Sequence, residues 1–299
     1  MTRVCQAFRL SRCRRGDTET RRHRDRAAGL SPRPRVPASP RPRVTGRLVL
    51  AAALLLVATK GTAQLLSDLE VERPLAIEDA RPVSYRAFSG SVDWTYNVRQ
   101  DRLNDHGPGF SLLYGAARGL ELGGGVRYVT RPGRNALRGI SSGDIVLHAL
   151  YALKTETADW PALAVRAGVE FPTGLDSKGT DLNLAILATR SFESFRLHVN
   201  GLWTRLGATG STERNDRFEA ILGADCLVNT RRQTDTLLVT DVSLQSNPVR
   251  SGNLILAVEA GLRQRIGVQT IFFVGTGAEL TGERDRARFR VRVGLTHIY

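Results

Sequence analysis

Hydrophobic and polar residues alternate one by one in the last segment of the chain. The apolar members of this alternation are Phe289, Val291, Val293, Leu295 and Tyr299, and the polar members are Arg288, Arg290, Arg292, Gly294 and Thr296. Successive side chains of a β-strand point to opposite faces of a sheet. The pattern therefore predicts a strand with one apolar face and one cationic face.

The same alternation recurs from residue 88 onward, in segments separated by residues that favour turns. The predicted strands cover residues 88–99, 110–116, 120–128, 144–154, 163–171, 182–188, 196–203, 217–226, 238–244, 254–263, 272–278 and 289–299. Their apolar faces contain no Lys, Arg, Asp or Glu, whereas their other faces carry most of the charges. The sequence thus predicts an all-β protein whose strands separate an apolar from a polar environment.

Two architectures can produce this segregation. A soluble sandwich hides its apolar faces inside, but it has edge strands that need protection and seldom runs twelve strands as a plain meander. Aromatic residues near the predicted strand ends are typical of a barrel in a membrane: they are Trp94, Tyr96, Tyr128, Tyr151, Trp203 and Tyr299. We therefore expect a transmembrane antiparallel up-and-down β-barrel of about 12 strands, in which the apolar residues of segment 289–299 form the barrel-closing C-terminal signal.

The connections between the predicted strands form two alternating sets. One set covers residues 117–119, 155–161, 189–195, 229–236 and 264–267, and the other covers 99–109, 129–143, 172–181, 205–216, 245–253 and 281–287. Bacterial barrels have short periplasmic turns and longer external loops, so we expect the second, longer set outside and both barrel ends in the periplasm. The expected location is the bacterial outer membrane, and the expected partners are outer-membrane lipid and the barrel-assembly machinery.

The formal net charge of +14 is concentrated at the N-terminus. Residues 1–47 hold 14 Arg and three acidic residues and are rich in Pro, so this head is predicted to be disordered. Its length is unusual ahead of a signal peptide, which suggests an upstream start-site artefact with translation beginning at Val44. The rest of the chain is nearly neutral, so we expect no nucleic-acid partner.

Residues 48–63 are predicted to be the hydrophobic and cleavage regions of a signal peptide. The apolar run 48–59 is too short to cross a hydrocarbon core of ~30 Å as a helix, and small residues precede a cut before Gln64. Residues 64–86 are expected either to hang in the periplasm or to fold inward as a plug. Residues 87–299 are the expected barrel.

Short motifs between residues 73 and 299 resemble the outer-membrane transporters grouped with the meta-pathway of phenol degradation. The motifs are Arg73-Pro74-Leu75, Glu78-Asp79-Ala80, Tyr114-Gly115, Leu120-Glu121-Leu122-Gly123, Gly143-Asp144, Pro161-Ala162-Leu163-Ala164 and Pro172-Thr173-Gly174. The turn at 116–119 departs from that family, which commonly has an acidic residue there. The resemblance implies a barrel that transports small compounds, aromatic ones among them.

No catalytic, metal or cofactor site is expected. His148 and His198 lie on the polar faces, His106 is expected in a loop, and His297 has no Ser two residues away, so a lipid-cleaving site at the rim is not indicated. Only Cys226 lies in the barrel region, which excludes a disulfide framework. Gly123-Gly124-Gly125 lies within a strand and is expected to permit curvature, not to bind phosphate.

Charged residues on the polar faces are the candidate pore lining. They are Arg127, Arg166, Glu170, Arg196, Glu259, Arg263, Arg290 and Arg292. They could line an open pore that selects anions, or pair with one another and fill a narrow barrel, because barrels of ~8 strands are filled and those of ~16 are open. We expect pairing with a narrow residual channel for a small-molecule solute. The alternative is a non-transport barrel, structural or lipid-modifying.

Overall fold

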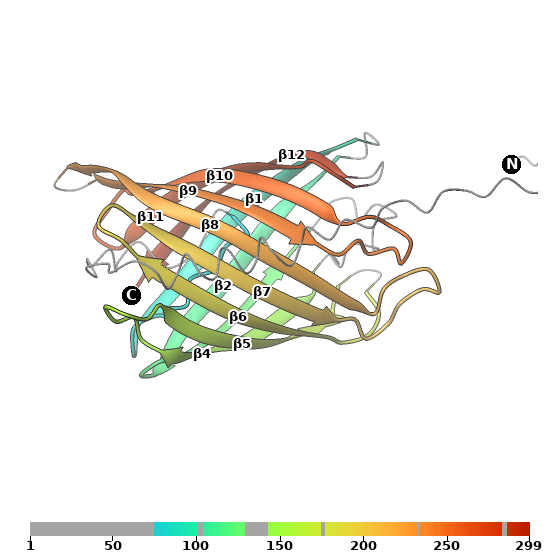
Figure 1. The fold of residues 1–299 in the computed structure, drawn as a ribbon, viewed down its shortest axis with the longest axis horizontal. Coiled ribbons are helices and arrows are strands. Elements are labelled where there is room, and N and C mark those ends of the chain that lie inside the picture. The colour runs from blue at the N-terminus through green and yellow to red at the C-terminus, as the bar shows by residue number, and fades with distance from the viewer. Residues whose placement is uncertain (1–74, 101–103, 129–142, 175–176, 232–233, 283–285) are drawn as a thin grey trace, which may run out of the picture. The chain divides into compact units, whose positions relative to one another are not determined.

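The computed structural model describes residues 75–100, 104–128, 143–174, 177–231, 234–282 and 286–299, with side chains described outside 229–235. These residues form twelve strands: β1 (Phe88–Arg99), β2 (Asp105–Ala117), β3 (Leu120–Arg127), β4 (Ile145–Lys154), β5 (Ala162–Phe171), β6 (Asp181–Ser191), β7 (Phe195–Arg205), β8 (Asp216–Arg231), β9 (Thr234–Gln245), β10 (Ile255–Arg265), β11 (Thr270–Glu279) and β12 (Ala287–Ile298). Each strand pairs with its neighbours in the sequence, and β1 pairs antiparallel with β12 (Figure 1). The predicted closed up-and-down barrel is therefore confirmed. Among the described residues, no helix is long and apolar enough to cross a membrane.

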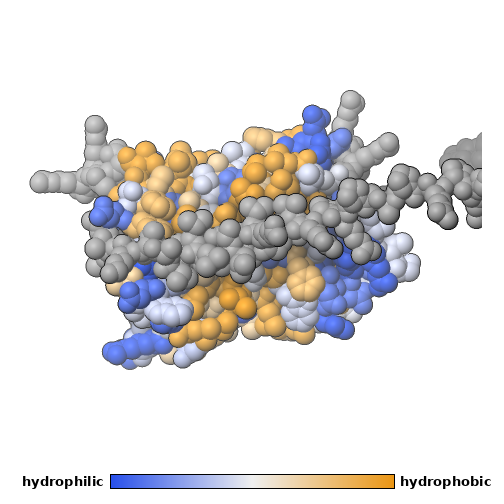
Figure 2. All heavy atoms as spheres, in the orientation of Figure 1, coloured by the Kyte–Doolittle hydropathy of each residue, from blue (hydrophilic) through white to orange (hydrophobic). Residues whose placement is uncertain are grey.

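The apolar faces of the strands point outward. Val92, Leu112 and Ile186 are 51%, 55% and 66% exposed, whereas Asp93, the neighbour of Val92, is buried inside. Figure 2 shows the consequence on one side of the barrel, where hydrophobic side chains gather over the middle and hydrophilic ones towards the ends. An apolar outer surface of this extent is what a lipid bilayer requires of a transmembrane barrel.

The predicted C-terminal strand closes the barrel, with one difference near its start. The Tyr299 N–H donates a hydrogen bond to the Phe88 carbonyl at 2.8 Å, which joins the two ends of the sheet. The register between β1 and β12 shifts so that Ala287, not Arg288, lies opposite Arg99. Ala287 is buried and Arg288 is exposed, so the expected inward position of Arg288 was wrong, because a bulge inserts an extra residue there.

Two predicted connections are mostly strand. Residues 105–109 belong to β2, and His106, which was expected in a loop, stacks on the Trp94 ring with a centroid separation of 5.4 Å. Pro108 lies just beyond the last β2–β3 pair, where its carbonyl accepts a hydrogen bond from the Tyr128 N–H. Proline is tolerated there because the N–H that it lacks would fall at the end of the β2–β3 ladder. The predicted connection 229–236 is largely the paired ends of β8 and β9.

The described part of the segment before the first strand is residues 75–87. Residues 75–83 of it lie inside the barrel, whereas residues 84–86 are exposed. Leu75, Ile77, Ala80 and Val83 are all buried. The segment leaves the barrel beside Gly115, whose N–H donates to the Ala87 carbonyl at 3.0 Å, and a Cβ at this glycine would lie 2.0 Å from the Ser84 oxygen. The backbone there approaches the wall so closely that only glycine fits. The predicted head and signal peptide, residues 1–63, lie outside the described residues.

Candidate channel lumen

Backbone N–H groups of the inner segment 75–87 bind side chains that line the barrel. The Ala76 N–H donates to Glu259 Oε2 at 3.0 Å, and the Ile77 N–H donates to Asp241 Oδ2 at 3.2 Å. Further along, Ala80 and Val83 donate to Thr189 Oγ1 at 3.0 Å and Glu121 Oε2 at 2.9 Å. The acceptors come from strands β3, β6, β9 and β10, so the segment is attached to several parts of the wall.

Two acidic side chains of the inner segment bind arginines of the wall. The Arg166 guanidinium pairs with the Glu78 carboxylate. The Arg196 guanidinium, which is 1% exposed, lies 3.3 Å from Asp79 Oδ2 and binds Asp225 through two hydrogen bonds of 2.9 and 2.6 Å. A buried arginine with two carboxylate partners is satisfied in charge and in hydrogen bonding, so removing one partner would leave an uncompensated charge.

The inner segment also packs against apolar side chains that face inward. Leu75 and Ile77 contact a buried cluster on β8 and β9, whose members are Ile221, Leu237 and Val239. Ala80 contacts a second cluster on β4, β5 and β6, whose members are Leu150, Ala162, Ala164, Ala185 and Leu187. The lumen therefore contains a small hydrophobic core, which narrows the space left for a solute.

Other charges of the lumen pair across the wall. Asp93 of β1 binds Arg292 Nη2 at 2.7 Å and Arg127 Nη2 at 3.3 Å. Arg290 donates to Glu259 Oε1 at 3.0 Å and to Asn97 Oδ1 at 3.0 Å. These pairs agree with the expectation that cations and anions of a narrow barrel neutralise one another.

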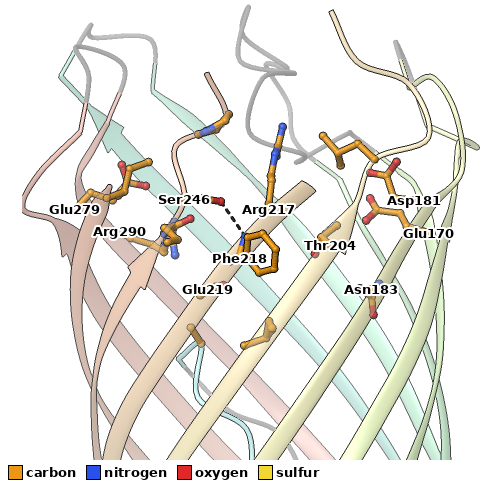
Figure 3. Close-up of a pocket in the computed structure, with 16 residues that line it drawn as sticks. Glu170, Asp181, Asn183, Thr204, Arg217, Phe218, Glu219, Ser246, Glu279 and Arg290 are labelled. Carbon is orange, nitrogen blue, oxygen red and sulfur yellow. Dashed lines mark hydrogen bonds between the residues drawn. The ribbon is translucent and has the colours of Figure 1, made fainter. Parts of the chain in front are cut away.

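A cavity of about 350 Å³ lies on the side of the long connections. Glu170, Asp181, Arg217, Glu219, Glu279 and Arg290 contribute its charged groups (Figure 3). Ala76 of the inner segment also borders it, together with Leu202 and Ile255. The cavity is thus a polar vestibule that ends against the inner segment.

A second cavity, of about 430 Å³, lies against strands β1 to β5 and β12. It shares Glu170 with the vestibule, so the two cavities are neighbours. Arg127, Arg166 and Arg292 line it, and Gly109 and Gly125 leave its wall without side chains. Together the cavities form a space lined by charged residues within the lumen.

The eight candidate pore residues are placed as follows. Arg127, Arg166, Glu170, Arg290 and Arg292 border the cavities, whereas Arg196 and Arg263 are buried and Glu259 holds the inner segment. That these residues line a pore stays a prediction. The closing-signal residues Phe289, Val293, Leu295 and Tyr299 are exposed on the outer face and Val291 is partly exposed.

Several inward carboxylates were not selected from the sequence. Asp93, Asp225 and Asp241 lie on the polar faces of their predicted strands. Asp93 and Asp225 pair with arginines, and Asp241 accepts a hydrogen bond from the inner segment. Their position on the polar face was the available signal. Which of these carboxylates meet a cation depends on strands that are distant in the sequence.

Three buried residues form a chain that resembles a catalytic triad in connectivity. His198 Nδ1 lies 3.0 Å from Thr189 Oγ1, and His198 Nε2 lies 3.1 Å from Asp225 Oδ2. The Thr189 side chain is fully buried, however, and its oxygen accepts the Ala80 N–H. A nucleophile must reach its substrate, which a buried Thr189 hydroxyl cannot do. The three hydrogen-bonded residues hold the inner segment in place instead. Among the described residues, no group of three His, Cys, Asp or Glu side chains could hold a metal ion.

The closed twelve-strand barrel, its apolar exterior and its charged lumen define the class of outer-membrane β-barrels. The chain is similar to an outer membrane channel from Pseudomonas putida F1, with a TM-score of 0.54 and 14% identity over 77% of this chain and 100% of that chain. It is also similar to the NanC porin, with a TM-score of 0.50 and 9% identity over 70% of this chain and 98% of that chain. These likenesses show the fold. No protein-family model and no curated protein sequence matches the chain.

Proposed function

We propose that the protein is an outer-membrane channel for the passive passage of small molecules, placed with its long connections outside and its short turns in the periplasm. The observation that carries this proposal is the pair of neighbouring charged cavities inside a closed barrel with an apolar exterior. A purely structural barrel of this size would gain nothing from charged cavities in its lumen.

The inner segment 75–87 gives the channel its narrow bore. Its apolar side chains fill the lumen beside β4 to β9, and its acidic side chains neutralise Arg166 and Arg196. The resemblance to transporters of the phenol meta-pathway suggests that aromatic compounds are among the solutes. The cavity volumes are within the range of ordinary small-molecule sites.

Solute and ion flux through the purified full chain test the proposal. In a planar bilayer the protein should give a small, steady conductance, and liposomes that contain it should swell in a solution of a small neutral solute. The double variant Glu78→Gln, Asp79→Asn removes both acidic contacts of the inner segment, so its conductance should be larger.

The matched control is Glu193→Gln, because Glu193 is exposed in a short turn and should leave the conductance unchanged. Absence of conductance and of swelling in all three proteins, each with a folded barrel, would refute the channel function. A structural or lipid-modifying role would then be the better interpretation.

A further inference from the structure

A cluster on β1, β3 and β12 places two guanidinium groups around one carboxylate. Asp93 is only 5% exposed and accepts hydrogen bonds from Arg292 at 2.7 Å, from Arg127 at 3.3 Å and from Thr95 Oγ1 at 3.2 Å. All three charged residues border the cavity of about 430 Å³. The cluster therefore presents cationic hydrogen-bond donors to this cavity.

The strand register explains why the two arginines can reach Asp93. Asp93, Gly109 and Arg127 lie at the same level across β1, β2 and β3. A Cβ at position 109 would lie 2.6 Å from Asp93 Oδ1, so the missing side chain opens the passage from Arg127 to the carboxylate. On the other side Asp93 lies opposite Gly294, and Arg292 reaches it from the position two residues earlier on β12.

We propose that this cluster is a binding site for small organic carboxylates in the lumen, and that Asp93 sets its affinity. An arginine pairs best with a planar carboxylate, through two parallel hydrogen bonds. Asp93 already supplies one carboxylate to two guanidiniums. A solute carboxylate in the cavity supplies the second and completes an arrangement of two anions and two cations.

The remaining charges of the cavity have partners elsewhere or act against the ligand. Arg166 pairs with Glu78, and the Asp144 carboxylate accepts bonds from the Gly174 N–H and the Ser177 hydroxyl, both at 2.7 Å. Glu170 lines the same cavity from β5. Asp93 and Glu170 therefore repel a bound anion, whereas Arg127 and Arg292 attract it.

This arrangement predicts opposite effects for neighbouring residues. Arg127→Gln should weaken the binding of benzoate about tenfold, the size expected when one charge-assisted hydrogen-bond partner is lost. Asp93→Asn keeps the shape of the side chain but removes a competing charge, so it should strengthen binding about threefold or more. A merely structural role of the cluster would make both variants bind less well.

The experiment is isothermal titration of the purified full chain in detergent with benzoate, and with benzamide as the neutral analogue of the same shape. We expect benzoate to bind and benzamide to bind at least tenfold more weakly. The control Arg205→Gln removes an arginine that is 58% exposed on the outer face and should leave benzoate binding unchanged. Retained barrel structure is checked by the difference in gel migration between unheated and heated samples.

Equal binding of the two compounds, or weaker benzoate binding in both Asp93→Asn and Arg127→Gln, would overturn the proposal. The inference deepens the proposed channel function, and the two can fail separately. Flux through the bilayer without preferential benzoate binding refutes the carboxylate site alone. Preferential benzoate binding without flux refutes the channel alone.

Discussion

The strand register predicts which residue of the closing strand lies deepest in the membrane. On the outer face of β1, Phe88 stacks on Tyr114 at one end, and Tyr96 and Trp94 stack on His106 towards the other. Val92 lies midway between Phe88 and Tyr96, and Leu295 of β12 lies directly opposite Val92. Because aromatic girdles mark the two interfaces of a barrel, Leu295 is expected near the bilayer midplane.

The geometry gives a consistent thickness. Strands rise about 3.3 Å per residue and tilt by roughly 40°, so the eight steps from Phe88 to Tyr96 cover ~20 Å along the membrane normal. An apolar band of ~25 Å is usual. Val291 is opposite Tyr96 and therefore lies at the girdle, although its position in the sequence alone suggests the middle of the strand.

Leu295→Arg should therefore cost about 2–4 kcal/mol of folding free energy, and Val291→Arg about 0–1 kcal/mol, because a lipid-facing Arg is costly only away from the interfaces. Equilibrium unfolding from liposomes by guanidinium chloride measures both values. Leu295→Met is the control for lost side-chain shape and should be nearly neutral. A larger cost at position 291 than at position 295 would refute the membrane placement, and no cost at either would refute the membrane-spanning barrel.

Three further predictions follow from the barrel and its lumen. The mature protein in detergent should migrate faster on an unboiled SDS gel than on a boiled one, because a closed strand ladder resists SDS until it is heated; identical migration together with solubility in the absence of detergent would contradict the barrel. Arg292→Val should leave folding intact, since Arg292 faces the lumen. It should lower the permeability to anions relative to cations, measured as a shift in reversal potential in a salt gradient. An unchanged reversal potential would contradict a role of Arg292 in ion selectivity. Gly115→Ala should displace the inner segment from the lumen, because the new Cβ would lie 2.0 Å from the Ser84 oxygen. Protease cleavage within 75–87 and conductance should then both rise, while the gel shift remains. A segment as protected from protease as in the unaltered protein would show that it leaves the barrel by another route.

The alternation of side chains determined the strands and the two faces of the barrel. Each strand in a membrane barrel must keep charges off its outer face. This requirement shows in the sequence of each strand by itself, as in the alternation of Val291, Arg292 and Val293. The alternation does not define the strand boundaries where glycine, proline or polar residues occur within a strand. Residues 105–109 resemble a loop in composition, yet pairing with β1 holds them in β2.

The tertiary structure decided what fills the lumen. The sequence places Arg127, Asp93 and Arg292 on polar faces, but their convergence depends on the register of three strands and on the missing side chain of Gly109. The inward position of residues 75–83 depends on acceptor side chains from strands far apart in the chain, such as Asp241 and Thr189. A local pattern reports the environment of each side chain, whereas the partner of a buried charge is set by closure of the whole barrel.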